Sequence, residues 1–292
     1  MNAYASGNGA RICELARGVG FSEGPVVTPN GEIYVTSITH GRVYCIGNGA
    51  EVHGEVGGGA NGAALDSDGV LYVAQNGGRW ARTGPRWGPN SVGGIQRVTP
   101  DSGVSWLTRE PIAPNDLCFG PDGMLYVTDP TRAPGSHDGR IWRVDPVSGV
   151  SELLISVTTW FPNGIAFGPD GRLYVAATDT SSIHRFEIVN GNLMNEQIVI
   201  QMRQGYPDGI AFDADGNLVI AAIARDVGSG AIQTWSLEGA LLDTFSPGTH
   251  RAYTNVAFTP GGDLVVTDSD GEAVLLAKGW PVAGLPLYPF RS

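Results

Sequence analysis

The chain has 292 residues, a formal net charge of -11 and no cluster of basic residues, which argues against nucleic acid or an anionic membrane as a partner. With 43 glycines, 19 prolines and 42% hydrophobic residues, it is too apolar for a disordered chain and too rich in turn formers for a helical bundle. No apolar run reaches membrane-spanning length, no signal peptide is apparent, and the three cysteines are scattered. We therefore expect a cytoplasmic protein with reduced thiols.

One hairpin pattern recurs six times along the chain. In FPNGIAFGPDGRLYV, from Phe161, a strand leads through a Pro-Asp-Gly turn into a second strand. The copies begin at Glu23, Asn61, Asn115, Asn163, Asp208 and Thr254, and their turn glycines are Gly31, Gly69, Gly123, Gly171, Gly216 and Gly262. A repeat of about 45 residues with further strand segments after each hairpin is typical of a β-propeller blade.

The count of strand segments predicts how the ring of blades closes. Each hairpin is followed by a third strand such as GRIWRVD, and the first five copies by a fourth such as GVSELLI, whereas the sixth runs into the proline-rich WPVAGLPLYPF. The segment ARICELA, residues 10–16, precedes the first copy and belongs to no blade of its own. The sequence therefore predicts an all-β, six-bladed propeller as a single domain over residues 1–292, with this N-terminal strand completing the last blade.

Aligning the copies on their turn glycine reveals a polar position eight residues upstream. This position is occupied by Glu23, Asn61, Asn115, Asn163, Asp208 and Thr254, all of which offer oxygen atoms. Because the first strand of each blade lines the central channel, these side chains should form a ring at one mouth of it. Carboxylate and amide oxygens favour a hard cation such as Ca²⁺, and the absence of His or Cys from the ring makes Zn²⁺ less suitable. Mg²⁺ and Mn²⁺ stay open as alternatives. In a single copy the polar residue would be no more than a strand-initiating turn residue.

The loops that join second and third strands should lie on the same face as this ring. The longest, QNGGRWARTGPRWGPNSVGG, carries Trp80, Arg82, Arg86 and Trp87, and we predict that it lines a substrate pocket together with Phe161, Tyr206 and Asn61. Asp129 and Asp268 each end a second strand at that face, as hydrogen-bond partners of the ring or as simple turn acids. No GxSxG, HExxH or Walker motif is present.

Four motifs in this order resemble the senescence-marker-protein/gluconolactonase/luciferin-regenerating-enzyme-like family: SEGP with Glu23, PNDL with Asn115 and Asp116, PNG with Asn163 and PDG with Asp208. The resemblance implies one divalent metal ion held by Glu23, Asn163 and Asp208, with Asn115 as a further ligand or a contact to water and substrate. It also implies that Asp208 is the base or nucleophile. Family members that act on sugar lactones carry an arginine where this chain has Ala113. The native substrate is thus expected to be more apolar or aromatic than gluconolactone.

The sequence therefore predicts a metal-dependent hydrolase of a lactone or related ester, in which Asp208, ionised at neutral pH, activates water or attacks directly and Asn115 orients the substrate. A phosphotriester-type hydrolase or an isomerase or lyase working through a metal enolate would use the same residues. A calcium-binding propeller without catalysis is the alternative from another class, because fold does not fix function. The expected partner is a small-molecule substrate, and the sequence leaves the oligomeric state open.

Overall fold

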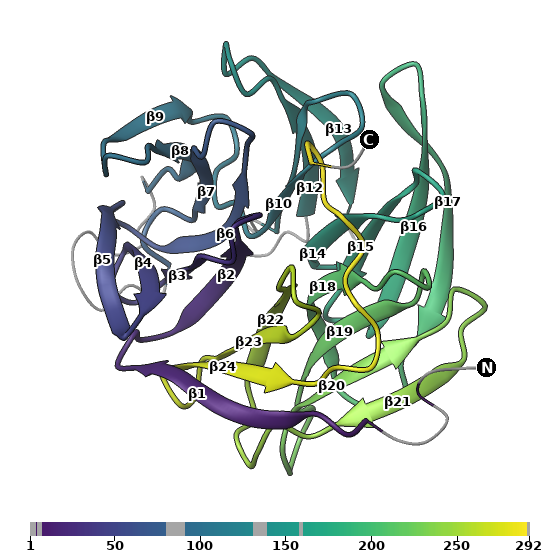
Figure 1. Ribbon diagram of the computed structural model, residues 1–292. Helices are drawn as coiled ribbons and strands as arrows, with labels where there is room; N and C mark the ends of the chain where they lie inside the picture. Colours follow the sequence, from purple (N-terminus) through teal and green to yellow (C-terminus); the bar gives the residue numbers. More distant parts are fainter. Residues whose placement is uncertain (1–3, 5–7, 80–90, 131–138, 158–159, 291–292) are drawn as a thin grey trace.

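Six four-stranded antiparallel sheets surround a central axis (Figure 1). The computed structural model describes the chain apart from residues 1–3, 5–7, 80–90, 131–138, 158–159 and 291–292. Within the described residues the secondary structure is entirely β, and none of it is a helix long and apolar enough to cross a membrane. The predicted six-bladed β-propeller is confirmed.

Each blade is built from four strands that follow one another outward from the axis. The first strands are β2 (Ser22–Val27), β6 (Ala60–Leu65), β10 (Leu117–Phe119), β14 (Pro162–Phe167), β18 (Tyr206–Phe212) and β22 (Tyr253–Phe258). The second strands are β3 (Ile33–Ser37), β7 (Leu71–Gln75), β11 (Leu125–Asp129), β15 (Leu173–Ala177), β19 (Leu218–Ile223) and β23 (Leu264–Asp268). The third strands are β4 (Arg42–Gly47), β8 (Gly94–Val98), β12 (Gly139–Val144), β16 (Ser182–Val189), β20 (Ala231–Trp235) and β24 (Ala273–Lys278). The outer strands are β5 (Gly49–Glu55), β9 (Val104–Thr108), β13 (Ser151–Val157), β17 (Asn192–Gln201), β21 (Leu241–Phe245) and, for the sixth blade, β1 (Arg11–Arg17).

The ring of blades is closed by the N-terminal strand, as the sequence predicts. β1 pairs antiparallel with β24 in the register Arg11↔Lys278 to Arg17↔Ala273, so the first strand of the chain is the outer strand of the last blade (Figure 1). The inner strands β2 and β22 also contact each other across this closure. Blade six therefore contains strands from both the N-terminal and the C-terminal part of the chain.

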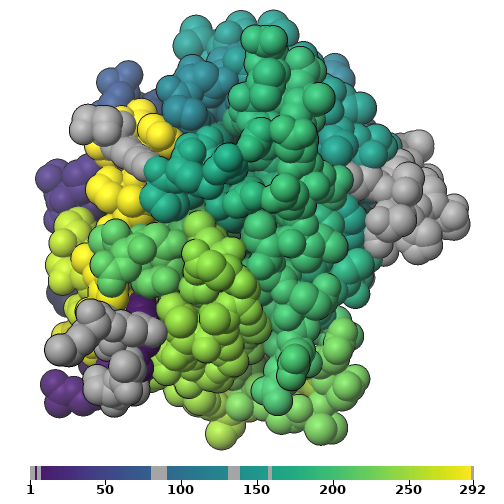
Figure 2. Space-filling model, turned by 90° about the vertical axis from the view of Figure 1, so that its right-hand side faces the viewer, coloured from purple at the N-terminus to yellow at the C-terminus, as the bar shows by residue number. Residues whose placement is uncertain are grey.

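Burial between blades supplies the core. Six clusters of buried apolar side chains each fill the space between two neighbouring blades, and they include Val35 against Val265 at the closure and Ile165 against Tyr126 between blades three and four. The six twisted sheets pack face to face around the axis. Figure 2 shows blades four and five edge-on, with the yellow C-terminal segment on one edge of the molecule.

Threonine hydroxyls tie neighbouring blades together close to the axis. Four of them donate a hydrogen bond to a backbone carbonyl near the start of the next blade's inner strand: Thr36 to Asn61, Thr128 to Asn163 at 2.8 Å, Thr178 to Pro207 at 2.8 Å and Thr254 to Ser22 at 3.0 Å. Buried hydrogen bonds of this kind hold the starts of the inner strands in place. The ring of polar residues therefore stands on a rigid support.

Candidate active site

The polar residue at the start of each inner strand lies at a β-bulge. In blade one Glu23 pairs with Thr36 and Val26 with Tyr34, so the inner strand carries one residue more than its partner. The same shift occurs at Ala60/Ala63, Pro162/Ile165, Pro207/Ile210 and Tyr253/Asn255. In blade three the Asn115 amide donates to the Thr128 carbonyl while the Thr128 amide donates to the Asp116 carbonyl. A bulge breaks the regular alternation and redirects side chains, which explains why asparagine is tolerated at these positions.

The bulges place the six predicted residues around one mouth of the channel. We call Glu23, Asn61, Asn115, Asn163, Asp208 and Thr254 the polar ring. Five of them are buried, with Glu23 and Asp208 each 5% exposed, and Asn115 is half-buried. Charged groups are rarely buried to this extent unless they are paired or bind a metal.

A second tier of residues lies directly below the polar ring, one position further along each strand. Its members are Gly24, Gly62, Asp116, Gly164, Gly209 and Asn255. A Cβ atom on Gly62 would lie 2.2 Å from Asp116 Oδ1, and one on Gly209 would lie 2.1 Å from Asn255 Oδ1. The glycines therefore leave the room that the side chains of Asp116, from blade three, and Asn255, from blade six, occupy.

Asn255 connects the two tiers. Its Oδ1 accepts a hydrogen bond from the Val256 amide at 2.8 Å, so its amide nitrogen is the group that donates to the carboxylates of Glu23 and Asp116. Asp116 has the matching local geometry, since its Oδ1 accepts from the Leu117 amide at 2.9 Å. Asp116 and Asn255 are thus equivalent positions in opposite blades that meet below the ring.

Three carboxyl groups perturb one another at this mouth. Burial, followed by the charges of Asp208 and Asp116, raises the pKa of Glu23 well above its usual range. Burial and the charge of Asp116 likewise raise the pKa of Asp208. Burial also raises the pKa of Asp116, to about 7, although hydrogen bonds from Leu117 and Asn255 oppose the rise. Without a cation, burial and mutual repulsion therefore favour the protonated forms of these carboxyl groups.

The residues present fit a hard divalent cation. Asn61 Oδ1 is buried without a hydrogen-bond partner, and Asn163 uses its amide nitrogen on Thr178 Oγ1 at 3.0 Å, which turns its carbonyl oxygen the other way. No ion pair within the described residues joins a basic side chain to Glu23, Asp116 or Asp208. In the described part of the chain, no three His, Cys, Asp or Glu side chains cluster closely enough to hold a metal by themselves, so the amide oxygens would have to complete the ligand set.

The predicted pocket walls are only partly within the described residues. Phe161 and Tyr206 are both half-buried beside the ring, and the Arg225 guanidinium lies 5.1 Å from the centre of the Tyr206 ring and donates to Ser181 Oγ. Trp80, Arg82, Arg86 and Trp87 lie outside the described residues. Ala113 is buried.

The acids that end the second strands of blades three and six hold loops. Asp129 accepts hydrogen bonds from the amides of Ile112 and Ala113 and from Trp142 Nε1, which fixes the segment that leads into β10. Asp268 accepts from the Gly271 amide, and its Oδ2 lies 2.6 Å from His250 Nδ1. Of the two roles open from sequence, these hydrogen bonds favour the structural one.

A second arrangement with the geometry of a hydrolytic triad occurs in blade four. His184 Nε2 lies 3.0 Å from Ser182 Oγ, and His184 Nδ1 lies 2.7 Å from Glu196 Oε1. Ser182 is fully buried, however, and the Trp160 ring stacks on the imidazole with the ring centres 4.3 Å apart. A serine nucleophile needs access to its substrate, so we assign this network a structural role.

Sequence reasoning missed Asp116 and Asn255 as members of the site. Asp116 belongs to the PNDL motif but lies one residue after the aligned polar position, which is eight residues before the turn glycine. The signal was one position further along, where four of the six copies carry glycine and the other two carry an acid and an amide. A polar pair among glycines indicates side chains that need the space the glycines leave.

The four sequence motifs lie on the bulged inner strands that carry the buried acids of the polar ring. A family model matches most of the chain. The model of the SMP-30/Gluconolactonase/LRE-like region matches residues 21–269, which include the whole polar ring. The chain belongs to the SMP-30/gluconolactonase/LRE-like family. No curated protein matches it significantly in sequence.

Solved structures of similar fold include named members of this SMP-30/gluconolactonase/LRE-like group. A gluconolactonase from Xanthomonas campestris is 22% identical over 94% of this chain and 90% of that one, with a TM-score of 0.73. Regucalcin from Agrobacterium tumefaciens, described as a calcium-binding protein, is 19% identical over 98% of both chains, with a TM-score of 0.77. A luciferin-regenerating enzyme is 16% identical over 97% of this chain and 100% of that one, with a TM-score of 0.75. At these identities the likeness shows the fold alone.

Proposed function

We propose that the polar ring holds one divalent cation, with Ca²⁺ favoured, and that the chain hydrolyses a lactone or related ester of a small molecule at this site. The observation that carries the proposal is the convergence of two buried carboxylates, Glu23 and Asp208, with the amide of Asn163 and without a basic partner among the described residues. Membership of a family that includes gluconolactonases supports hydrolysis of this type. The calcium-binding description of the Agrobacterium neighbour supports the choice of ion.

Glu23, Asn163 and Asp208 would hold the cation, and a bound divalent cation polarises a carbonyl group and stabilises negative charge on its oxygen. Asp208 accepts the proton of the attacking water, or its carboxylate attacks the carbonyl carbon directly. Its burial suits it to proton transfer, because burial raises its pKa and makes its carboxylate a stronger base. From below, Asn255 donates a hydrogen bond to Glu23, while Asn163 donates one to Asp208, and the charge of Asp116 raises the pKa values of both carboxyl groups.

The substrate would bind above the ring. Asn115 is the ring member with the greatest exposure and can therefore orient the substrate or its water. Phe161 and Tyr206 offer aromatic surface beside it. Sugar-lactone hydrolases of this family carry an arginine at the position of Ala113. Because this chain lacks that arginine and offers aromatic surface instead, we expect an apolar or aromatic lactone or ester as substrate rather than gluconolactone.

The proposal is tested with a panel of lactones, aryl esters and phosphotriesters, with and without EDTA. We expect hydrolysis of at least one lactone or aryl ester, loss of that activity in EDTA and its return with Ca²⁺. Activity that survives EDTA would contradict the proposal. Turnover of phosphotriesters alone, elimination or isomerisation products, or calcium binding without turnover on the whole panel would each favour one of the alternative functions.

A matched pair of variants tests the role of Asp208. Asp208→Asn removes the charge in the ring and should abolish turnover, reducing it by at least about a hundredfold, as loss of a general base does. Asp170→Asn makes the same change in a hairpin turn, where Asp170 accepts hydrogen bonds from Arg172 and Tyr174, and should leave turnover unchanged. Full activity of metal-loaded Asp208→Asn would refute the mechanism.

A further inference from the structure

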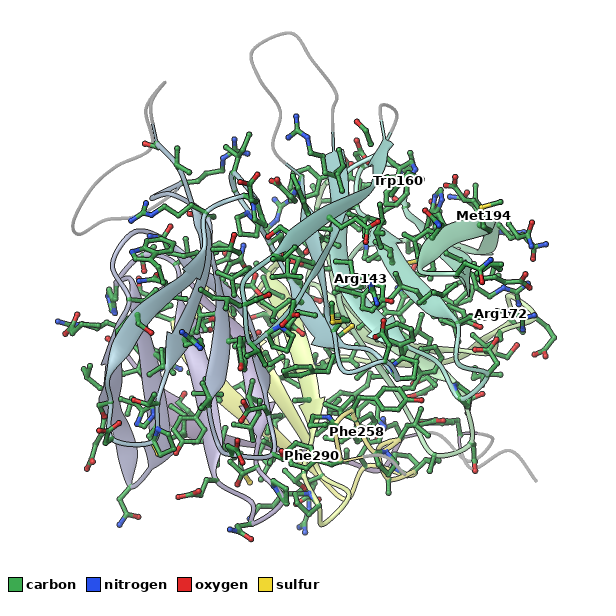
Figure 3. All side chains as sticks on the ribbon, turned by 90° about the horizontal axis from the view of Figure 1, so that it is seen from above. Arg143, Trp160, Arg172, Met194, Phe258 and Phe290 are labelled. Atoms are coloured by element: carbon green, nitrogen blue, oxygen red, sulfur yellow. The ribbon has the colours of Figure 1, made fainter. Side chains whose placement is uncertain are left out.

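The central channel contains a cavity on the side of the second tier away from the polar ring. Its volume is about 380 Å³, and Asp116 and Asn255 line the end nearest the ring. All six inner strands contribute to its wall, which places it on the axis of the propeller. In Figure 3, Phe258 and Phe290, which both line it, lie near one face of the molecule, and Trp160 lies near the other.

The hollow is built into every copy of the repeat. Five residues before each turn glycine the chain carries a small or modest side chain, and all six of these residues line the cavity: Val26, Ala64, Cys118, Ala166, Ala211 and Ala257. The next position carries the bulkier Val27, Leu65, Phe119, Phe167, Phe212 and Phe258, which supply an apolar and largely aromatic wall. Protein interiors normally leave few voids larger than a water molecule, so a space of this size with such walls suits a ligand.

The C-terminal segment borders the outer end of the cavity. Figure 1 shows it in yellow, leaving blade six and passing in front of blades five and four. The Leu285 amide donates to the Phe212 carbonyl at 2.9 Å, and the Tyr288 ring packs edge-on against Phe167 with the ring centres 6.1 Å apart. Leu287 and Phe290 line the cavity yet are 61% and 41% exposed, so the rim at this end is apolar.

The lining chemistry defines the class of ligand. No lysine, arginine or histidine is among the described residues that line the cavity, and its one acid is Asp116, so an anionic ligand would meet no opposite charge there. Asp116 and Asn255, 8% and 7% exposed, offer hydrogen-bonding groups at the inner end. At about 30 Å³ for each water-sized group, the space corresponds to on the order of ten to fifteen non-hydrogen atoms.

We propose that the channel cavity is a second binding site, separate from the polar ring, for an uncharged amphipathic small molecule. The apolar body of the ligand lies among the phenylalanines, and its single polar head lies against Asp116 and Asn255. Leu287 and Phe290 form the apolar rim through which it enters. The proposal concerns ligand binding in the channel and does not depend on the reaction proposed for the polar ring.

The experiment uses the full chain and the neutral fluorophore 1-aminoanthracene, whose emission rises in apolar surroundings. We expect saturable binding of one probe per chain, displaced by n-decanol and displaced at least about tenfold less well by decanoate, because the described apolar lining offers a carboxylate no cation. Ala257→Phe places a ring in the cavity and should weaken probe binding by at least about tenfold, whereas Ala240→Phe, on the exposed outer turn of blade five, should not change it.

A second measurement guards against misfolding of Ala257→Phe. In a Cys13→Ser/Cys45→Ser background, Cys118 is the remaining thiol and lines the cavity, so n-decanol should slow its alkylation by a neutral maleimide. Absence of saturable probe binding, or unchanged affinity in a folded Ala257→Phe variant, would show that the channel holds only water. Equal displacement by decanoate and n-decanol would overturn the assignment of an uncharged ligand. These readouts are binding and labelling, so failure here leaves the function of the ring untouched.

Discussion

Replacing Asp116 by asparagine should change stability in opposite directions depending on whether the cation is present. In the metal-free protein the raised pKa of Asp116 means that the folded state holds its proton more tightly than the unfolded chain does. Stability is therefore fully present below the ordinary carboxyl pKa of about 4 and is lost as the pH rises toward about 7, the folded pKa of Asp116. Asp116→Asn removes this loss, so at pH 8 in EDTA the variant should be more stable than the wild type.

The size of the effect follows from the pKa difference. A rise from about 3.9 to about 7 for Asp116 corresponds to about 4 kcal/mol at 1.36 kcal/mol per pKa unit, which sets the upper limit of the gain at pH 8. The asparagine keeps the carbonyl oxygen that accepts from the Leu117 amide, so little is lost in hydrogen bonding. With Ca²⁺ present the sign reverses, because the variant lacks a buried negative charge that would attract the cation.

Urea unfolding at pH 5 and pH 8, with EDTA or with Ca²⁺, measures these differences directly. We expect nearly equal stabilities at pH 5, a more stable variant at pH 8 in EDTA, and a smaller stabilisation by Ca²⁺ in the variant. If Asp116→Asn is destabilised in EDTA by the same amount at both pH values, the carboxyl does not carry the ionisation penalty and the electrostatic account of the ring is wrong.

Two further predictions concern the packing around the ring and the rival site in blade four. Gly62→Ala should lower the free energy of unfolding by about 1–3 kcal/mol and weaken metal binding, because the new Cβ would lie 2.2 Å from Asp116 Oδ1. Thermal unfolding measures the loss, and Gly47→Ala, whose new Cβ would meet no atom within 4 Å, is the control. Ser182→Ala should leave turnover unchanged, since the serine beside His184 is fully buried; loss of activity together with labelling of the wild type by a fluorophosphonate would move the chemistry to that network.

Much of the fold could be predicted from the sequence because each blade repeats its own turn chemistry. The turn glycines Gly31 and Gly171, for example, have φ values of +87° and +73°, which other residues rarely adopt. A glycine at this position therefore indicates each hairpin in the sequence. The N-terminal strand was predictable by counting, since residues 10–16 had no partner and blade six lacked one. The polar ring could be found by the same alignment, because equivalent positions in a propeller are equidistant from the axis.

The rest of the site could not be predicted because it depends on contacts between blades. An alignment of the copies marks Asp116 and Asn255 as an acid and an amide among glycines, but their contact below the ring joins opposite blades and exists only in the closed propeller. The raised pKa of Asp208 has a similar origin, because its burial and its neighbour Asp116 are properties of the assembled ring. The cavity was likewise hidden, since six small residues spread through the chain form it only when the ring closes.

Calcium titration by calorimetry near pH 7 in two buffers of different ionisation enthalpy tests the central claim most directly. The account predicts one Ca²⁺ per chain, with net release of protons from the carboxyl groups whose pKa values burial raises, and loss of both signals in Glu23→Gln/Asp208→Asn. A wild-type protein that binds no divalent cation, or a double variant that binds it as tightly as the wild type, would contradict the assignment of the polar ring as a metal site.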